Sequence, residues 1–250
     1  MSAPGIAGRA LVLLVAGTIA PATPSCGEDP TPAAATIRGI VRFEGTRPRI
    51  IVEPLWGLDP CGQKGFAKAK AVAEQAGIND DGTLRDVFVR ATGAREASRA
   101  ESPAEPARLS VRNCFFEPRV LGIRAGQRLV VRSEDTTPHA VHGSARANPV
   151  LSFGLSGAGE ERTITFASEE TIPVKCDRHG WEEAWIHVVA HPYFDVTRDG
   201  GTFEIGDLPP GAHTIEAWHE RYGRQERLVT LAPSAMETVE FVFRADEAKK

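Results

Sequence analysis

The chain has 250 residues, 42% of them hydrophobic, and a formal net charge of −4. It is therefore long enough for one large domain or two small domains with real cores. The composition argues against nucleic-acid binding, because no basic run is interleaved with aromatic residues. Val, Ile, Thr and Phe with Gly and Pro punctuation dominate the second half, which favours an all-β fold.

The N-terminus has the pattern of an export signal over residues 1–22. Arg9 precedes an apolar run over 10–20 that is too short to span a bilayer comfortably, and small residues follow at Ala20 and Ala22. An uncleaved anchor or a disordered tail is the alternative. Residues 23–35 are rich in Pro and Ala and predict a linker.

Cys26 in this linker leaves two locations open. Followed by Gly-Glu-Asp just past an apolar run, it has the pattern of a bacterial lipoprotein acylation site, which would anchor the protein at the outer membrane or cell surface. Cleavage after Ala22 would instead give a periplasmic protein. Without acylation, Cys26 lies free in the linker or leaves with the signal peptide.

Residues 36–108 predict an N-terminal β region. Thr36–Glu44 alternates in the β manner, and Leu84–Arg90 predicts a second strand. Between them, Phe66–Gly77 has helical propensity but few large apolar residues, so an exposed strand or loop is equally open. The segment 93–107 is most simply a surface loop.

Two further β regions follow. Residues 109–190 contain short apolar segments at a spacing of about ten residues with turn signals between them, which predicts a sandwich or barrel. Residues 191–245 predict a small antiparallel sandwich, with a hairpin turn at Arg198-Asp-Gly-Gly201. The region 36–108 can pair with 191–243 to complete one sandwich around an inserted domain. The charged tail 246–250 predicts fraying.

The chemistry-bearing residues gather in two short stretches. Cys176 and His179 are three residues apart after a β-branched segment, and His139 and His142 form a second pair upstream. One Cys with two His is the ligand set of a mononuclear copper centre, and it also suits zinc. The alternative is a buried Cys with unrelated surface histidines.

His142 has its own alternatives. On a strand it faces away from His139, whereas in a bent loop it could be a fourth ligand or a hydrogen-bond donor behind the ligands. The remaining histidines lie on or beside predicted strands and are interpreted as structural: His187, His191, His213 and His219.

The cysteine count leaves a thiol for the metal. If Cys26 is lost or acylated, Cys61, Cys114 and Cys176 remain, and an odd number leaves one thiol free. The economical interpretation pairs Cys61 with Cys114 in a disulfide. Pairing of either residue elsewhere, or reduced thiols, stays open.

Two sets of motifs carry a family resemblance. Cys176-Asp-Arg-His-Gly-Trp181, with His139-Ala-Val-His142 and Asn113-Cys-Phe-Phe-Glu-Pro before it, resembles the plastocyanin- and azurin-like cupredoxins, in particular exported proteins labelled methylamine-utilisation-like. His191-Pro-Tyr-Phe-Asp, Leu208-Pro-Pro-Gly and Ala217-Trp-His-Glu220 resemble the transthyretin-like, carboxypeptidase-regulatory sandwich. The resemblance implies a Greek-key cupredoxin-like sandwich over 109–190 and a second sandwich over 191–245.

The resemblance also implies the copper ligands. They are the first His of His-x-x-His, the Cys and His of Cys-x-x-His, and a Met directly after the Trp. The first three correspond to His139, Cys176 and His179, but Glu182 occupies the Met position. A carboxylate there would favour Cu(II) and lower the reduction potential. Glu182 as a solvated turn residue is the alternative.

The expected function is an exported, non-enzymatic electron carrier with one copper ion and a redox partner protein that the sequence does not identify. Copper carriage or storage fits the change from Met to Glu. A scaffold whose metal site has decayed, and an enzyme using the Cys176 thiol, are the remaining hypotheses. The thiol enzyme is disfavoured because no acidic residue that would orient a His base is evident.

Overall fold

The computed structural model describes residues 1, 33–48, 61, 77–92 and 102–245. The chain divides into two compact units, Met1–Thr31 and Pro32–Lys250, and every strand described below belongs to the second. The predicted signal (Met1 apart), most of the predicted linker including Cys26, nearly all of the segment 66–77 and the tail lie outside the described residues. Within the described part of the chain, no helix is both long and apolar enough to cross a membrane.

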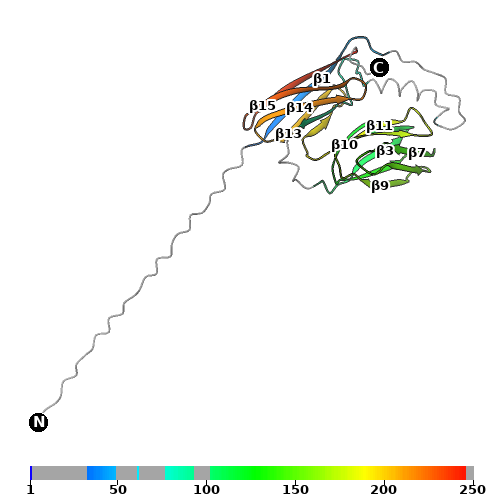
Figure 1. Ribbon diagram of the computed structural model, residues 1–250, viewed down its shortest axis with the longest axis horizontal. Coiled ribbons are helices and arrows are strands. Elements are labelled where there is room, and N and C mark those ends of the chain that lie inside the picture. Colours follow the sequence, from blue (N-terminus) through cyan, green and yellow to red (C-terminus); the bar gives the residue numbers. More distant parts are fainter. Residues whose placement is uncertain (2–32, 49–60, 62–76, 93–101, 246–250) are drawn as a thin grey trace. The chain divides into compact units, whose positions relative to one another are not determined.

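The described residues form an all-β fold of four sheets (Figure 1), as the sequence predicts. Two sheets, ordered β13-β1-β16 and β12-β2-β14-β15, enclose one apolar core. Their strands come from both ends of the second unit: β1 (Ala35–Glu44), β2 (Phe88–Thr92), β12 (Phe194–Val196), β13 (Thr202–Leu208), β14 (Gly211–His219), β15 (Gly223–Leu231) and β16 (Met236–Arg244). We call this the terminal sandwich.

The other two sheets, ordered β5-β11-β10-β7-β8 and β4-β3-β6-β9, enclose a second core. Their strands are consecutive in sequence: β3 (Ala107–Arg112), β4 (Phe115–Glu117), β5 (Val120–Arg124), β6 (Arg128–Ser133), β7 (His139–Gly143), β8 (Leu151–Leu155), β9 (Glu161–Thr165), β10 (Glu170–Cys176) and β11 (Glu183–Val189). We call this the inserted sandwich. It begins two residues before the predicted boundary at 109.

Alternating burial explains how β1 forms. Its residues alternate between buried and more exposed, with Ile37, Val41 and Phe43 turned into the core. Gly39 lies where a Cβ atom would be 2.2 Å from the ring of Phe203, so a side chain there would exclude that ring from the core. β1 pairs antiparallel with β13 and parallel with β16. The terminal sandwich is therefore not purely antiparallel, which differs from the prediction, because β1 and β16 form a parallel pair.

Two predictions within the terminal sandwich differ from the structure. The strand expected from Leu84 begins at Phe88, because Leu84 makes only an isolated bridge with Ile78. The turn at 198–201 forms, with Gly201 N–H donating to Arg198 O at 2.8 Å, but it does not close a hairpin. β12 pairs with β2 and β13 pairs with β1, so the turn carries the chain from one sheet to the other.

Aromatic side chains fill the contact between the two sandwiches. His187 of β11 stacks on Phe88 of β2 with ring centroids 4.0 Å apart, and it makes a T-shaped contact with Trp218 at a centroid distance of 4.5 Å. Arg119 Nη2 and Glu220 Oε1 form an ion pair of 2.8 Å beside them, and both side chains are nearly buried. This contact is tightly packed, since a Cβ atom on Gly122 would lie 2.4 Å from the ring of Phe194.

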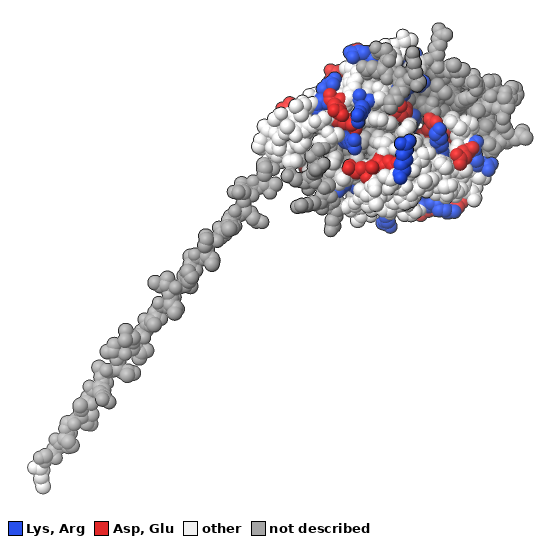
Figure 2. Space-filling view, in the orientation of Figure 1, with Lys and Arg blue, Asp and Glu red and all other residues white. Residues whose placement is uncertain are grey.

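The surface of the described residues carries side chains of both charges. On the face in Figure 2, basic and acidic side chains are interspersed rather than gathered by sign. Many are paired across strands, for example Arg38 with Glu204 and Arg42 with Glu240, each at 2.8 Å. Exposed pairs of this kind add little stability.

Candidate metal centre

The loop between β10 and β11 places three of the predicted residues around one point. β10 ends at Cys176, and β11 begins at Glu183. The loop is closed by Cys176 N–H donating to Glu182 O at 3.1 Å and by Glu182 N–H donating to His179 O at 2.9 Å. The three-residue spacing of Cys176, His179 and Glu182 thus becomes a compact turn with all three side chains on its inner side.

His139 reaches the same point from the neighbouring strand. It is the first residue of β7, which pairs antiparallel with β10 so that Val141 lies opposite Cys176. Asp177 N–H also donates to Ala140 O at 2.9 Å. This pairing fixes the start of β7 against the β10–β11 loop, 37 residues away in sequence.

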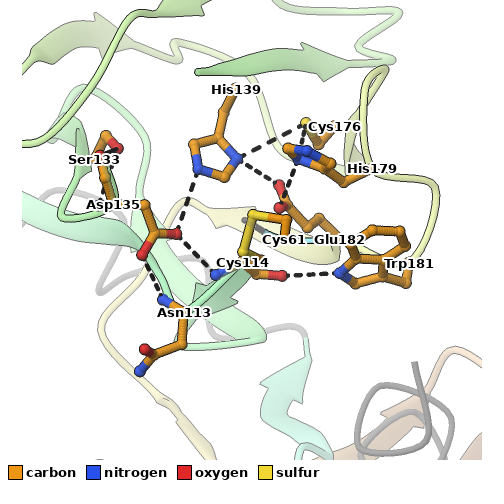
Figure 3. Close-up of a disulfide and its surroundings, with 10 residues drawn as sticks. All are labelled: Cys61, Asn113, Cys114, Ser133, Asp135, His139, Cys176, His179, Trp181 and Glu182. Atoms are coloured by element: carbon orange, nitrogen blue, oxygen red, sulfur yellow. Dashed lines mark hydrogen bonds and ion pairs between the residues drawn. A yellow bond between two sulfur atoms is a disulfide. The ribbon is translucent and has the colours of Figure 1, made fainter. Parts of the chain in front are cut away.

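The four side chains present their donor atoms to one another (Figure 3). His139 Nδ1 lies 3.0 Å from Glu182 Oε2 and 4.0 Å from Cys176 Sγ. His179 Nδ1 lies 2.9 Å from Glu182 Oε1 and 3.5 Å from Cys176 Sγ. The donor atoms of the four residues all lie within 4.8 Å of one another.

The four side chains are polar or ionisable and yet almost completely buried. His139, Cys176, His179 and Glu182 are all at most 2% exposed. Burial lowers the pKa of His139, but hydrogen bonding and charge from Cys176 and Glu182 outweigh it and raise the pKa to about 9. His139 Nε2 and Glu182 Oε1 make no hydrogen bond of good geometry within the described residues, although Asp135 Oδ2 lies 3.3 Å from the first and His179 Nδ1 lies 2.9 Å from the second.

This donor set fits a bound metal ion. Two imidazoles, one thiol and one carboxylate, buried together and offering atoms within 4.8 Å, are the ligands that copper and zinc share. A cation would compensate the buried carboxylate and thiolate, which are otherwise costly to take out of water. His139, Cys176, His179 and Glu182 are therefore the residues that would hold it.

The structure decides between the interpretations that the sequence leaves open for Glu182 and for His142. Glu182 is fully buried between the two imidazoles, so it is not a solvated turn residue. His142 lies on the other face of β7, with its side chain 43% exposed and Nδ1 3.9 Å from Asp177 Oδ2. It is not one of the four clustered residues, because residues three apart on a strand face opposite ways.

The other predicted residues lie apart from this cluster. Cys61 and Cys114 form the predicted disulfide, which leaves Cys176 free and buried. No metal-ligand cluster among the described residues includes the four histidines interpreted as structural: His187, His191, His213 and His219.

Sequence reasoning missed two residues beside the centre. Asp135 Oδ2 lies 3.3 Å from His139 Nε2, and Trp181 Nε1 donates to Cys114 O at 3.1 Å. The only signal for Asp135 was its position four residues before His139 in the polar segment 133–137. Trp181 was visible as part of the family motif, but nothing in the sequence pairs it with Cys114.

Comparisons with known proteins give partial structural likenesses. No family model matches the chain, and no curated protein matches it. A purple cupredoxin from Nitrosopumilus maritimus is 19% identical over 33% of this chain and 99% of its own, with a TM-score of 0.30. Amicyanin from Paracoccus versutus is 14% identical over 42% of this chain and 100% of its own, with a TM-score of 0.30.

A Cu-containing nitrite reductase from Thermus scotoductus is 21% identical over 37% of this chain, with a TM-score of 0.33. The chain spans only 26% of that protein's length. TM-scores of this size describe a partly similar chain path and carry no conclusion about function. The all-β fold follows from the strand pairing, and the candidate site follows from the distances between its four side chains.

Proposed function

We propose that this protein binds one copper ion through His139, Cys176, His179 and Glu182, and that it is an exported, non-enzymatic electron carrier of the cupredoxin type. The observation that carries the proposal is the burial of these four donors within 4.8 Å of one another. Bound copper supplies one-electron redox chemistry, and thiolate with imidazole suits both of its oxidation states.

The chain's own residues support electron transfer in two ways. The strand pairing of β7 with β10 holds His139 and Cys176 in register, so the donors are positioned before any ion arrives. The near-complete burial of the four side chains excludes water, which limits the reorganisation that accompanies a change of charge.

Glu182 favours a second candidate function, copper carriage or storage. A hard anionic oxygen stabilises Cu(II) relative to Cu(I) and lowers the reduction potential. The observation behind this alternative is that both oxygens of Glu182 face imidazole nitrogens, at 2.9 and 3.0 Å. A carrier of this kind needs affinity but no rapid, reversible redox cycle.

The test is copper loading of the purified protein. After one equivalent of Cu(II) and desalting, we expect one retained copper and an intense visible thiolate-to-copper band. Cys176→Ser should abolish the band and the stoichiometric binding while leaving the circular dichroism unchanged. His142→Ala is the matched control and should retain both, since His142 lies on the opposite face of β7.

The outcomes separate the hypotheses. Unchanged copper stoichiometry in Cys176→Ser would contradict the ligand assignment, and absence of copper from the unaltered protein would leave a scaffold. Reversible voltammetry of the loaded protein would support electron transfer, whereas tight binding without a reversible wave would support carriage. Competition with zinc then tests whether copper is the preferred metal, as the order of divalent affinities predicts.

A further inference from the structure

The backbone of one residue, Cys114, contacts both halves of the candidate centre. The N–H of Cys114 donates to Asp135 Oδ2 at 2.7 Å, and the carbonyl of the same residue accepts from Trp181 Nε1 at 3.1 Å. Figure 3 shows both contacts, with the disulfide directly beside them. Asp135 contacts His139, which is one half of the centre. Trp181 belongs to the loop that carries the other half, Cys176, His179 and Glu182.

The Asp135 carboxylate accepts two backbone hydrogen bonds in addition to its contact with His139. Its Oδ1 accepts from Asn113 N–H and its Oδ2 from Cys114 N–H, each at 2.7 Å. Both donors have positive φ, 52° for Asn113 and 65° for Cys114, so two successive N–H groups converge on one carboxylate. Asp135 Oδ2 then lies 3.3 Å from His139 Nε2, opposite the Nδ1 that faces the cluster.

This arrangement can fix the orientation of the imidazole. A carboxylate behind a ligating His sets the tautomer and the rotation of the ring and raises its basicity. With a proton on Nε2 facing Asp135, the lone pair of Nδ1 faces Cys176 and Glu182. Asp135 is thus placed to act on the centre through His139.

Trp181 supports the β10–β11 loop, which carries Cys176, His179 and Glu182. Its indole packs on Phe115, and its ring centroid lies 5.3 Å from that of His179. The hydrogen bond to Cys114 O fixes the indole, and with it the turn that follows His179. The β10–β11 loop and Asp135 are therefore both hydrogen-bonded to the backbone of Cys114.

The disulfide ties the backbone at Cys114 to a second part of the chain, at Cys61. Cys61 is 0% exposed and Cys114 is 3% exposed, so exchange with external thiols is hindered and the bond serves as a permanent link. We propose that the Cys61–Cys114 disulfide anchors the backbone at Cys114, and that through this anchor Asp135 positions His139 and Trp181 positions the β10–β11 loop. The proposal rests on the metal site proposed above.

The experiment measures Co(II) affinity and the Co(II) visible spectrum of the full protein, together with the unfolding midpoint of the metal-free form. We expect Asp135→Asn to weaken Co(II) binding by about 10–100-fold and to shift the ligand-field bands. Trp181→Phe, which keeps the packing but removes the donor, should also weaken binding. Glu134→Gln is the matched control, because Glu134 pairs with exposed Arg112 at 2.7 Å and its loss should change affinity by no more than about twofold.

A cycle with the disulfide tests the anchor itself. In a Cys61→Ala, Cys114→Ala background, Asp135→Asn should weaken binding further by much less than in the disulfide-bonded protein, because the carboxylate has already lost its fixed support. An equal loss in both backgrounds would overturn the anchor. If the disulfide-free protein does not fold, a smaller affinity change for Asp135→Asn than for Glu134→Gln would overturn the positioning role.

The design separates two failures. If the unaltered protein binds no Co(II) and no copper, the proposed function fails and this inference falls with it. If the unaltered protein binds Co(II) and Asp135→Asn binds equally well with an unchanged spectrum, the metal site stands and only the positioning role is wrong.

Discussion

His187 at the contact between the two sandwiches gives the structure a measurable pH dependence. The side chain is almost fully buried, stacked on Phe88, and its Nδ1 lies 3.0 Å from Thr171 Oγ1. Burial, with a smaller contribution from the charge of Arg90, lowers the pKa of His187 to about 3. In the unfolded chain the same imidazole has a pKa of about 6.5.

The sign of the effect follows from which state binds the proton. Above pH 6.5 the imidazole is neutral in both states and contributes no pH dependence. Between pH 6.5 and 3 the unfolded chain binds a proton that the folded protein does not, so the free energy of unfolding decreases as the pH falls. At pH 5 the loss from His187 alone is on the order of 2 kcal/mol.

The assay is urea unfolding of the metal-free protein at pH 7.5 and pH 5.0. We expect His187→Phe, which preserves an aromatic ring against Phe88, to lose about 2 kcal/mol less than the unaltered protein between the two pH values. Other groups titrate in both proteins and cancel in this difference. Equal losses in His187→Phe and the unaltered protein would refute the reasoning.

Three further substitutions test the centre and the packing. Glu182→Met should raise the reduction potential of the copper-loaded protein and intensify its visible band; an unchanged potential and spectrum would place Glu182 away from the metal. Gly122→Ala should destabilise the protein by about 1–3 kcal/mol in urea unfolding, because its Cβ would lie 2.4 Å from the ring of Phe194, and unchanged stability would contradict that contact. Phe166→Ala removes a fully buried side chain from the inserted sandwich, so it should cost about 3–5 kcal/mol; a loss below 1 kcal/mol would mean that this core is loosely packed.

Much of the centre could be predicted because its parts are local. Cys176 and His179 lie three residues apart in one loop, so their spacing alone placed them near each other, whereas Glu182 was identified from the position of the family's Met. His139 is different, since its approach depends on the pairing of β7 with β10. The family resemblance supplied that partner, and the residue spacing by itself did not.

Other features could not be predicted because they depend on distant backbone. The sequence left Glu182 either buried or solvated, and only its contacts with His139 and His179 decide between them. Asp135 gave no sign of a role, because its carboxylate is held by the N–H groups of Asn113 and Cys114, 22 and 21 residues earlier. The predicted hairpin at 198–201 failed for the same reason: the turn is local, but the partners of its two strands are not.

The sequence by itself determined the all-β class, most of the strands and the Cys-x-x-His pair of the candidate centre, because alternation, turn residues and residue spacing act over a few neighbouring residues. The tertiary structure decided which strands pair, where the chain crosses between sheets, and that the residues of β1 lie beside residues of β16 that are 200 positions later. It also decided which face of β7 meets the centre and which carboxylate supports it. These depend on burying two separate cores and satisfying buried backbone groups, which only the folded chain as a whole can do.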